Sequence, residues 1–490
     1  MSKTPSSSNH RSIESSEVVR KSVNGAISLG VRQILVQGAR IVAGIFLARI
    51  LTPAQFGVYA VILYLQTFLI AFGDAGLAGS LVRQHDEPEI ADYQAIFTIQ
   101  QVLVLLISAG LWFSSRWIAA SYHMRPNEAW LFRLVALSFV ATSFMVVPQI
   151  RLERKLEFHK VALIDSIQAI VFNVCAVVLA WKGFGAYSFA IALLLRALSG
   201  AIVAFWISPW AMRWHWDWVR VKSHMAFGLP YQGIQAASLL KDSISPVLVG
   251  FLLGTKEVGY ITWASMLAAY PVLALMVLQR IYMPAFARLQ HKTNELRSLV
   301  ENVIWSANAL VAPLSIITLV LIQPITVLIY GSKWLVATPY FYFFWMANLF
   351  VPTATPVLSL LNALGRSRTA LTFALIWMAG TWVIGAPLIL AYGTIGFAIA
   401  NLLVQFSNLW LYRVAQRWLP FRVYTVITPV WMIAAVSGAL VFVVCQLHHP
   451  GSLLLLGTYA IIGLVVYFVC AYVFFRDKLH RVLQQVRRPV

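Results

Sequence analysis

LTPAQFG at 51–57 and LGTKEVG at 253–259 are related stretches that lie 202 residues apart. A second pair, GAYSFAIALLL at 185–195 and GTIGFAIANLL at 393–403, is identical at seven of eleven positions and is offset by 208 residues. The two offsets agree to within six residues, which indicates an internal duplication. A parallel repeat of this kind predicts two similar halves with a substrate path at their interface.

The composition is that of a membrane protein. Of the 490 residues, 60% are hydrophobic and only 11% are charged, and the mean hydropathy is +0.77. A soluble protein of this size needs more polar surface. The composition therefore excludes a soluble enzyme, a disulfide scaffold, a fibrous protein and a disordered chain, and it predicts a chain that crosses a membrane many times.

Fourteen apolar segments are long enough to span a bilayer as helices. Their approximate limits are 22–49, 55–81, 93–114, 129–150, 161–181, 185–208, 223–253, 258–282, 298–322, 338–364, 369–391, 394–412, 423–446 and 451–475. The repeat offset makes spans 7–12 a copy of spans 1–6. An even number of helices per unit keeps both copies in the same orientation.

These patterns predict an all-α polytopic membrane protein with two pseudo-symmetric six-helix bundles around a central cavity, followed by two extra C-terminal helices. The expected division is a disordered cytosolic tail at 1–20, a first bundle at 21–208, a cytoplasmic linker at 209–222, a second bundle at 223–420, and two further helices with a cytosolic tail at 421–490.

The distribution of basic residues predicts the orientation. With the N-terminus inside, 26 of the 37 Lys and Arg residues fall in cytoplasmic segments and six fall in outside segments. Basic residues concentrate in the cytoplasmic loops of membrane proteins, so both termini are expected in the cytoplasm. The same bias explains the net charge of +20 without nucleic acid as a partner.

Polar side chains form one stripe on the first helix of each half. Each ionisable group at a span centre costs about 2.5–3.5 kcal/mol on insertion, so such groups are candidates for function. The two stripes are spaced so that each lies on one helical face. They comprise Gln33, Gln37 and Arg40, with Arg32 beside them, and Gln235, Ser238, Asp242 and Ser245, with Lys241 beside them.

By the repeat offset of 202 residues, Gln33 is equivalent to Gln235 and Arg40 is equivalent to Asp242. We interpret the stripes as two walls of a hydrated cavity, while an Arg40–Asp242 ion pair that holds the halves together is the alternative. Arg196, near the middle of its span, is a further cavity cation, and Asp74 in FGDAGLAGS is a second candidate for ion pairing or coupling.

Motifs for nucleotide or metal chemistry are missing from the sequence. It contains no GxxxxGK[ST] phosphate loop, no HExxH and no CxxC. The short predicted outside loops carry few acidic residues, which disfavours a membrane-embedded enzyme of cell-envelope assembly. We therefore expect no catalytic residues, no metal and no cofactor. A structural scaffold is disfavoured by the cost of the polar stripes.

Four segments, in this order and at these helix joints, resemble the Wzx-type polysaccharide and oligosaccharide flippases of the multidrug/oligosaccharidyl-lipid/polysaccharide (MOP) exporter superfamily. They are LARILTPAQFGVYA (47–60), FGDAGLAGSLVRQ (72–84), KDSISPVLVGFLLGTKEVGYITWA (241–264) and IYGSKWLVATPY (329–340). The resemblance covers nearly all of the chain after residue 20.

The resemblance implies translocation of an undecaprenyl-pyrophosphate-linked oligosaccharide across the bacterial inner membrane by alternating access, for lipopolysaccharide, capsule or exopolysaccharide synthesis. It also implies partnership with a polysaccharide polymerase and chain-length proteins. An anionic head group would need the cations Arg32, Arg40, Arg196 and Lys241. A cation-coupled multidrug antiporter of the same superfamily is the alternative, although it would favour a cavity rich in carboxylates.

Overall fold

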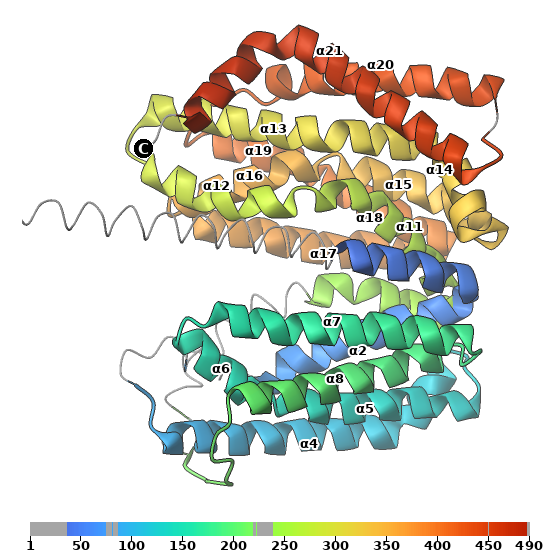
Figure 1. The fold of residues 1–490 in the computed structure, drawn as a ribbon, viewed down its shortest axis with the longest axis vertical. Coiled ribbons are helices and arrows are strands. Elements are labelled where there is room, and N and C mark those ends of the chain that lie inside the picture. The colour runs from blue at the N-terminus through green and yellow to red at the C-terminus, as the bar shows by residue number, and fades with distance from the viewer. Residues whose placement is uncertain are drawn as a thin grey trace, which may run out of the picture.

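The helices form two lobes. The protein is described by a computed structural model for residues 37–74, 81, 87–218, 222, 239–448 and 450–487. Figure 1 shows the lobes one above the other, with the first half of the chain below. The first lobe consists of α2 (Pro53–Asp74), α4 (Ile90–Ser121), η1 (Pro126–Glu128), α5 (Ala129–Ser143), α6 (Val146–Arg154), α7 (Phe158–Trp181) and α8 (Tyr187–Ile207).

The second lobe follows a short π-helix, η2 (Ile244–Val249), and α10 (Gly250–Leu253). Its remaining elements are α11 (Thr255–Leu273), α12 (Met276–Arg288), α13 (Thr293–Val320), α14 (Ile322–Ile325), η3 (Thr326–Tyr330), η4 (Ser332–Ala337), α15 (Thr338–Asn348), α16 (Val351–Ala363), α17 (Ser367–Tyr392), α18 (Thr394–Gln405), α19 (Ser407–Gln416), α20 (Tyr424–Leu447) and α21 (Leu453–Arg487). The last two helices pack on the outer side of this lobe, against α13 (Figure 1).

Within the described residues, eleven helices are long and apolar enough to cross a membrane. They coincide with eleven of the fourteen predicted spans, and the all-α polytopic fold is confirmed. The predicted spans 22–49 and 223–253 lie partly outside the described residues. The predicted span 258–282 consists of α11 and α12, which are separated shortly after Pro271. Proline lacks the backbone N–H that would continue the helix ladder. Similar breaks divide the spans 129–150, 338–364 and 394–412, between α5 and α6, α15 and α16, and α18 and α19.

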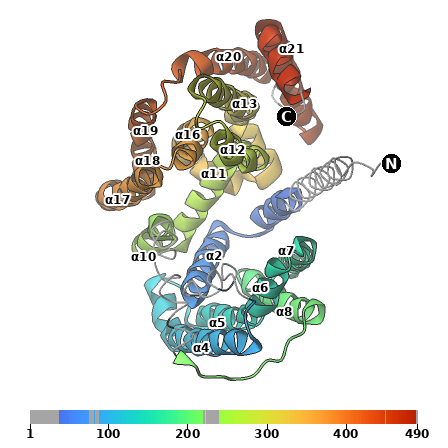
Figure 2. The ribbon, with the colours of Figure 1, turned by 90° about the vertical axis from the view of Figure 1, so that its left-hand side faces the viewer.

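The two lobes meet where the two copies of the repeat cross. We call this contact the seam; it is formed by residues 48–57, the start of α11, and η4. Gly57 lies against Thr255, and Gly259 lies against Pro53. Since Pro53 and Thr255, like Gly57 and Gly259, are 202 residues apart, the contact is reciprocal, as a two-fold relationship requires. Figure 2 shows α2 and α11 between the lobes, where the two helices pack against each other.

Hydrogen bonds from cations to helix ends also hold the seam. Arg49 donates to the carbonyls of Leu328 and Ile329 at 2.7 and 3.1 Å, at the end of η3. In the opposite direction, Lys333 donates to the carbonyls of Arg49 and Leu51 at 2.7 and 2.5 Å. These carbonyls end their helices and lack partners within the helix, so each lobe supplies the cation that caps a helix of the other.

Aromatic side chains fill the seam behind these bonds. Trp334 is fully buried, and its indole N–H donates to the carbonyl of Ala48 at 2.9 Å. Its ring packs edge-on against Phe56 and is stacked on Trp263, with centroids 5.4 and 5.3 Å apart. Large buried aromatic groups stabilise an interface strongly, so the lobes are firmly joined at this end.

Candidate functional site: a cavity between the lobes

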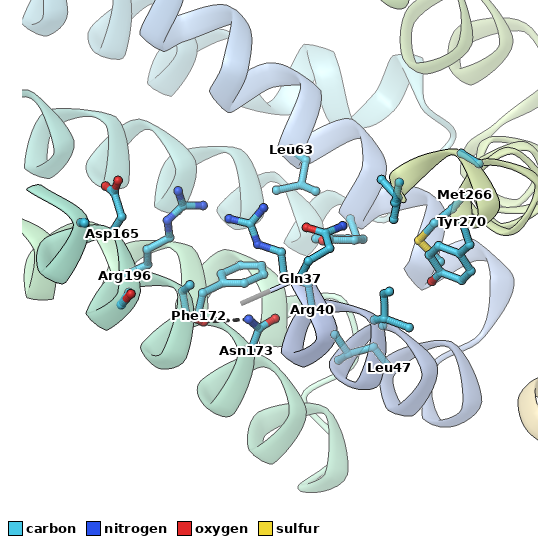
Figure 3. Close-up of a pocket in the computed structure, with 18 of the residues that line it drawn as sticks. Gln37, Arg40, Leu47, Leu63, Asp165, Phe172, Asn173, Arg196, Met266 and Tyr270 are labelled. Carbon is cyan, nitrogen blue, oxygen red and sulfur yellow. Dashed lines mark hydrogen bonds between the residues drawn. The ribbon is translucent and has the colours of Figure 1, made fainter. Parts of the chain in front are cut away.

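A cavity of about 890 Å³ lies between the first lobe, the helix at 37–50 and α11 (Figure 3). Leu47 and Phe56 line it next to the seam, so the seam closes this end. Its lining continues along α7 to the exposed Phe158, on the side where we predict the cytoplasm. The volume is in the range of sites that hold a small molecule or a head group.

Two arginines face this cavity from different helices. Figure 3 shows Arg40, from the helix at 37–50, and Arg196, from α8, pointing toward one another across it. Arg196 Nε donates to Gln168 Oε1 at 3.4 Å, and its guanidinium carbon lies 6.0 Å from the centre of the Phe172 ring. Two like charges held together in this way disfavour one another, so an anion between them would be stabilised.

Neutral polar and aromatic groups complete this wall. Asn173 donates to the carbonyl of Ala169 at 2.8 Å, which fixes its amide at the cavity surface. Tyr59 stacks on Phe189 with ring centroids 4.0 Å apart and lies 6.3 Å from Phe172. The wall therefore combines cations, an amide and flat aromatic faces.

The opposite wall has a different character. It is formed by α11, whose lining residues are Met266, Ala269, Tyr270 and Leu273. None of these side chains is charged. Among the residues that the structure describes, the charged lining residues come from the first half of the chain and are Arg40, Asp165 and Arg196. The cavity has a cationic wall and an apolar wall.

The structure brings together three of the predicted site residues: Gln37, Arg40 and Arg196 all line the cavity. Lys241 and Asp242 lie elsewhere and face each other, with Nζ and Oδ1 3.5 Å apart. Among the described residues, Asp242 forms no ion pair with Arg40 in this conformation, and Asp242 is exposed.

Four other predicted residues cannot be placed in this way. Arg32, Gln33 and Gln235 lie outside the described residues. Asp74 ends α2, but the position of its side chain is also outside what the structure describes.

The sequence analysis missed the part of the site that α7 provides. The lining residues Phe158, Ala162, Asp165, Ala169 and Asn173 recur at spacings of three or four, as one helical face requires. This face mixes polar and apolar residues within an apolar span, so it stands out less than the stripe on the first helix. Among the described residues, no group of three or more His, Cys, Asp or Glu side chains could hold a metal ion.

Solved structures share this fold. The lipid II flippase MurJ, in an inward closed conformation, aligns over 91% of this chain and 100% of its own, with a TM-score of 0.75 and 14% identity. A multidrug resistance MATE family transporter of the MOP superfamily, in an inward-facing conformation, aligns over 78% of this chain and 94% of its own, with a TM-score of 0.59 and 14% identity. The chain is thus a polytopic membrane protein with the two-lobe fold that these two structures share.

Residues 46–339 match the family described as "Polysaccharide biosynthesis protein", and the chain belongs to this family. Two relatives agree with this assignment. The succinoglycan biosynthesis transport protein ExoT of Rhizobium meliloti (strain 1021) is 26% identical over 469 residues, which are 92% of each chain. The lipopolysaccharide biosynthesis protein WzxC of Escherichia coli (strain K12) is 23% identical over 394 residues, which are 79% of each chain.

Proposed function

We propose that this protein is a flippase that moves an undecaprenyl-pyrophosphate-linked oligosaccharide across the bacterial inner membrane by alternating access. The product would serve the synthesis of a surface polysaccharide, alongside a polymerase and chain-length proteins. Relatives named for the transport or synthesis of succinoglycan and lipopolysaccharide support this class of substrate.

The observation that carries the proposal is the pair Arg40 and Arg196 in a cavity closed at one end by the seam. A pyrophosphate brought into a membrane loses hydration, and guanidinium groups replace it with charge-assisted hydrogen bonds. The aromatic faces of Tyr59 and Phe172 suit the apolar faces of sugar rings. The apolar wall of α11 suits the part of the substrate that carries no charge.

The cation-coupled antiporter alternative has less support. A drug cation would need carboxylates, whereas the described lining of the cavity holds two arginines and one acid, Asp165. We further propose that Arg32, Gln33, Gln37, Gln235 and Lys241 extend the polar path, and that Asp74 and Asp242 serve coupling or ion pairing.

We keep the predicted topology as part of this proposal. It places both termini in the cytoplasm and divides the chain into bundles at 21–208 and 223–420, joined by a linker at 209–222 and followed by helices within 421–490.

Deletion of the gene tests the proposal. The deletion strain should lose surface polysaccharide and accumulate carrier-linked oligosaccharide on the cytoplasmic leaflet, because synthesis continues while translocation stops. Expression of the wild-type chain should reverse both effects. Normal surface polysaccharide in the deletion strain, with increased sensitivity to cationic drugs, would refute the flippase and support the antiporter.

A further inference from the structure

A second cavity, of about 400 Å³, lies in the first lobe, apart from the cavity between the lobes. It is formed by the end of α6, the start of α4 and the loop after α8, and no described residue lines both cavities. Three of its lining residues are cationic, Arg151, Arg154 and Lys155, and one is acidic, Glu87. We call it the basic pocket.

The arginines of the basic pocket are anchored by backbone carbonyls. Arg151 donates to the carbonyl of Pro209 at 2.7 Å, and Arg154 donates to that of Leu81 at 2.5 Å. A carbonyl orients a guanidinium but does not cancel its charge. Because a guanidinium has five N–H donors, Arg151 keeps capacity to bind an anion. Lys155 adds an exposed ammonium group beside them.

The loop that borders the basic pocket carries a row of tryptophans. In residues 209–218, Trp210, Trp214, Trp216 and Trp218 occupy alternate positions with Met212. The loop is bound across the start of α4, where Gln94 donates to the carbonyl of Ala211 and the His215 amide donates to Thr98, both at 2.8 Å. Figure 1 shows it passing below α4 at the end of the lobe.

Three of these tryptophans are exposed: Trp214 and Trp216 each show 64% of their surface, and Trp218 shows 51%. Tryptophan concentrates at the interface between membrane and water. We therefore expect the loop and the basic pocket beside it to lie at the depth of the lipid head groups.

Trp210 connects the loop to the basic pocket. Its ring packs edge-on against Phe97 at 5.2 Å, and it lines the pocket. Its indole nitrogen is buried and has no hydrogen-bond partner among the described residues. Because this nitrogen has almost no accessible surface, Trp210 offers the pocket its ring and not its N–H group.

We propose that the basic pocket binds the phosphate of an anionic membrane lipid, with Arg151 and Lys155 supplying the positive charge that the phosphate needs. Basic pockets beside membrane helices suit such head groups. The position of the tryptophan loop favours a lipid over a soluble phosphate. The exposed Ile90 at the rim offers an apolar surface to an acyl chain.

Native mass spectrometry of the purified, delipidated full-length protein, titrated with cardiolipin or phosphatidylglycerol, tests this proposal. Each cation near a membrane surface strengthens binding about fivefold, so Arg151→Gln/Lys155→Gln should weaken it about 25-fold. The control Arg413→Gln/Arg417→Gln removes the same charge from exposed positions of the second lobe and should change nothing. Trp210→Phe keeps an aromatic ring on Phe97 and removes only the buried N–H, so it should leave binding unchanged.

The source of the phosphate is decided by competition. Zwitterionic phosphatidylethanolamine and inorganic phosphate should fail to displace cardiolipin. Displacement of cardiolipin by inorganic phosphate would show that the pocket binds a soluble anion. Preferential displacement by undecaprenyl phosphate would show that the pocket belongs to the substrate path. Either result overturns the proposal. Unchanged affinity in Arg151→Gln/Lys155→Gln, or in the exposed single variant Lys155→Gln if the double variant fails to fold, would also overturn it.

Discussion

Gly57 and Gly259 occupy equivalent positions in the two copies of the repeat and lie against each other where α2 crosses α11. A β-carbon on Gly57 would come within 2.8 Å of the Gly259 nitrogen, and one on Gly259 would come within 3.1 Å of the Gly57 nitrogen. Each would also overlap a backbone carbonyl, that of Thr255 or Pro53. Backbone cannot move aside as a flexible side chain can, so only glycine allows this approach.

We expect Gly57→Ala and Gly259→Ala each to force the lobes apart at the seam. The cost should be about 1–3 kcal/mol, the usual range for overpacking a tight contact. Thermal unfolding of the purified protein should show a lower midpoint, and complementation of the deletion strain should be impaired. Gly110→Ala is the matched control, since a β-carbon there meets no atom within 4 Å. If Gly57→Ala is as stable and active as Gly110→Ala, the close approach at the seam is not needed.

Neutralising the cavity cations should block transport without harming insertion. Arg40→Gln and Arg196→Gln each remove a partner of the proposed pyrophosphate, while the loss of an intramembrane charge makes insertion easier. Protein levels should stay normal, and carrier-linked oligosaccharide should accumulate on the cytoplasmic leaflet. Arg417→Gln, at an exposed position, is the control. Full surface polysaccharide in both cavity variants would contradict the electrostatic role.

The hydrogen bonds of Lys333 should help to keep the seam closed. Hydrogen bonds from a charged donor contribute about 1.5–3 kcal/mol, so Lys333→Met should favour opening. We would place a single cysteine at Leu47, behind the seam, in a chain from which Cys175, Cys445 and Cys470 have been removed. A membrane-impermeant maleimide added to spheroplasts should label it faster in Lys333→Met than in the parent. Equal labelling would show that these bonds do not control access.

The predicted topology can be measured directly. A reporter that is active only in the cytoplasm should be active when it is fused at Val490. The bias of 26 basic residues in cytoplasmic segments to six in outside segments predicts this result. Activity of a periplasm-dependent reporter at the same place would reverse the orientation. It would also place the basic pocket and the exposed end of the cavity on the outer side.

The positions and order of the membrane helices could be predicted from the sequence better than their internal shape. Long apolar segments predict spans reliably, and eleven of fourteen coincide with helices of the required length. Breaks such as that between α11 and α12 could not be placed from the sequence, because a proline such as Pro271 does not say whether a helix bends or ends. Likewise, a helical face identified Arg40 and a mid-span position identified Arg196, but only the fold shows that the two side chains line the same cavity.

The contacts between lobes were least accessible to sequence reasoning. Repeat offsets pair Arg40 with Asp242, yet a pair of equivalent positions touches only if it lies on the two-fold axis. Gly57 and Gly259 lie there, whereas Asp242 is 3.5 Å from its neighbour Lys241 instead. The offset gives equivalence between positions, and the crossing point of α2 and α11 decides which equivalent positions meet.

The charged side chains that line the cavity, within the described part of the chain, belong to its first half, and this has a kinetic consequence. If the lobes tilt during transport, a head group held by Arg40 and Arg196 keeps its ionic contacts while α11 slides past its uncharged side. Reorientation then needs no release of an anion into a poorly hydrated space, a step that would slow every cycle. Changes at Met266 or Tyr270 could adapt the cavity to another glycan and leave the anchoring of the shared carrier intact.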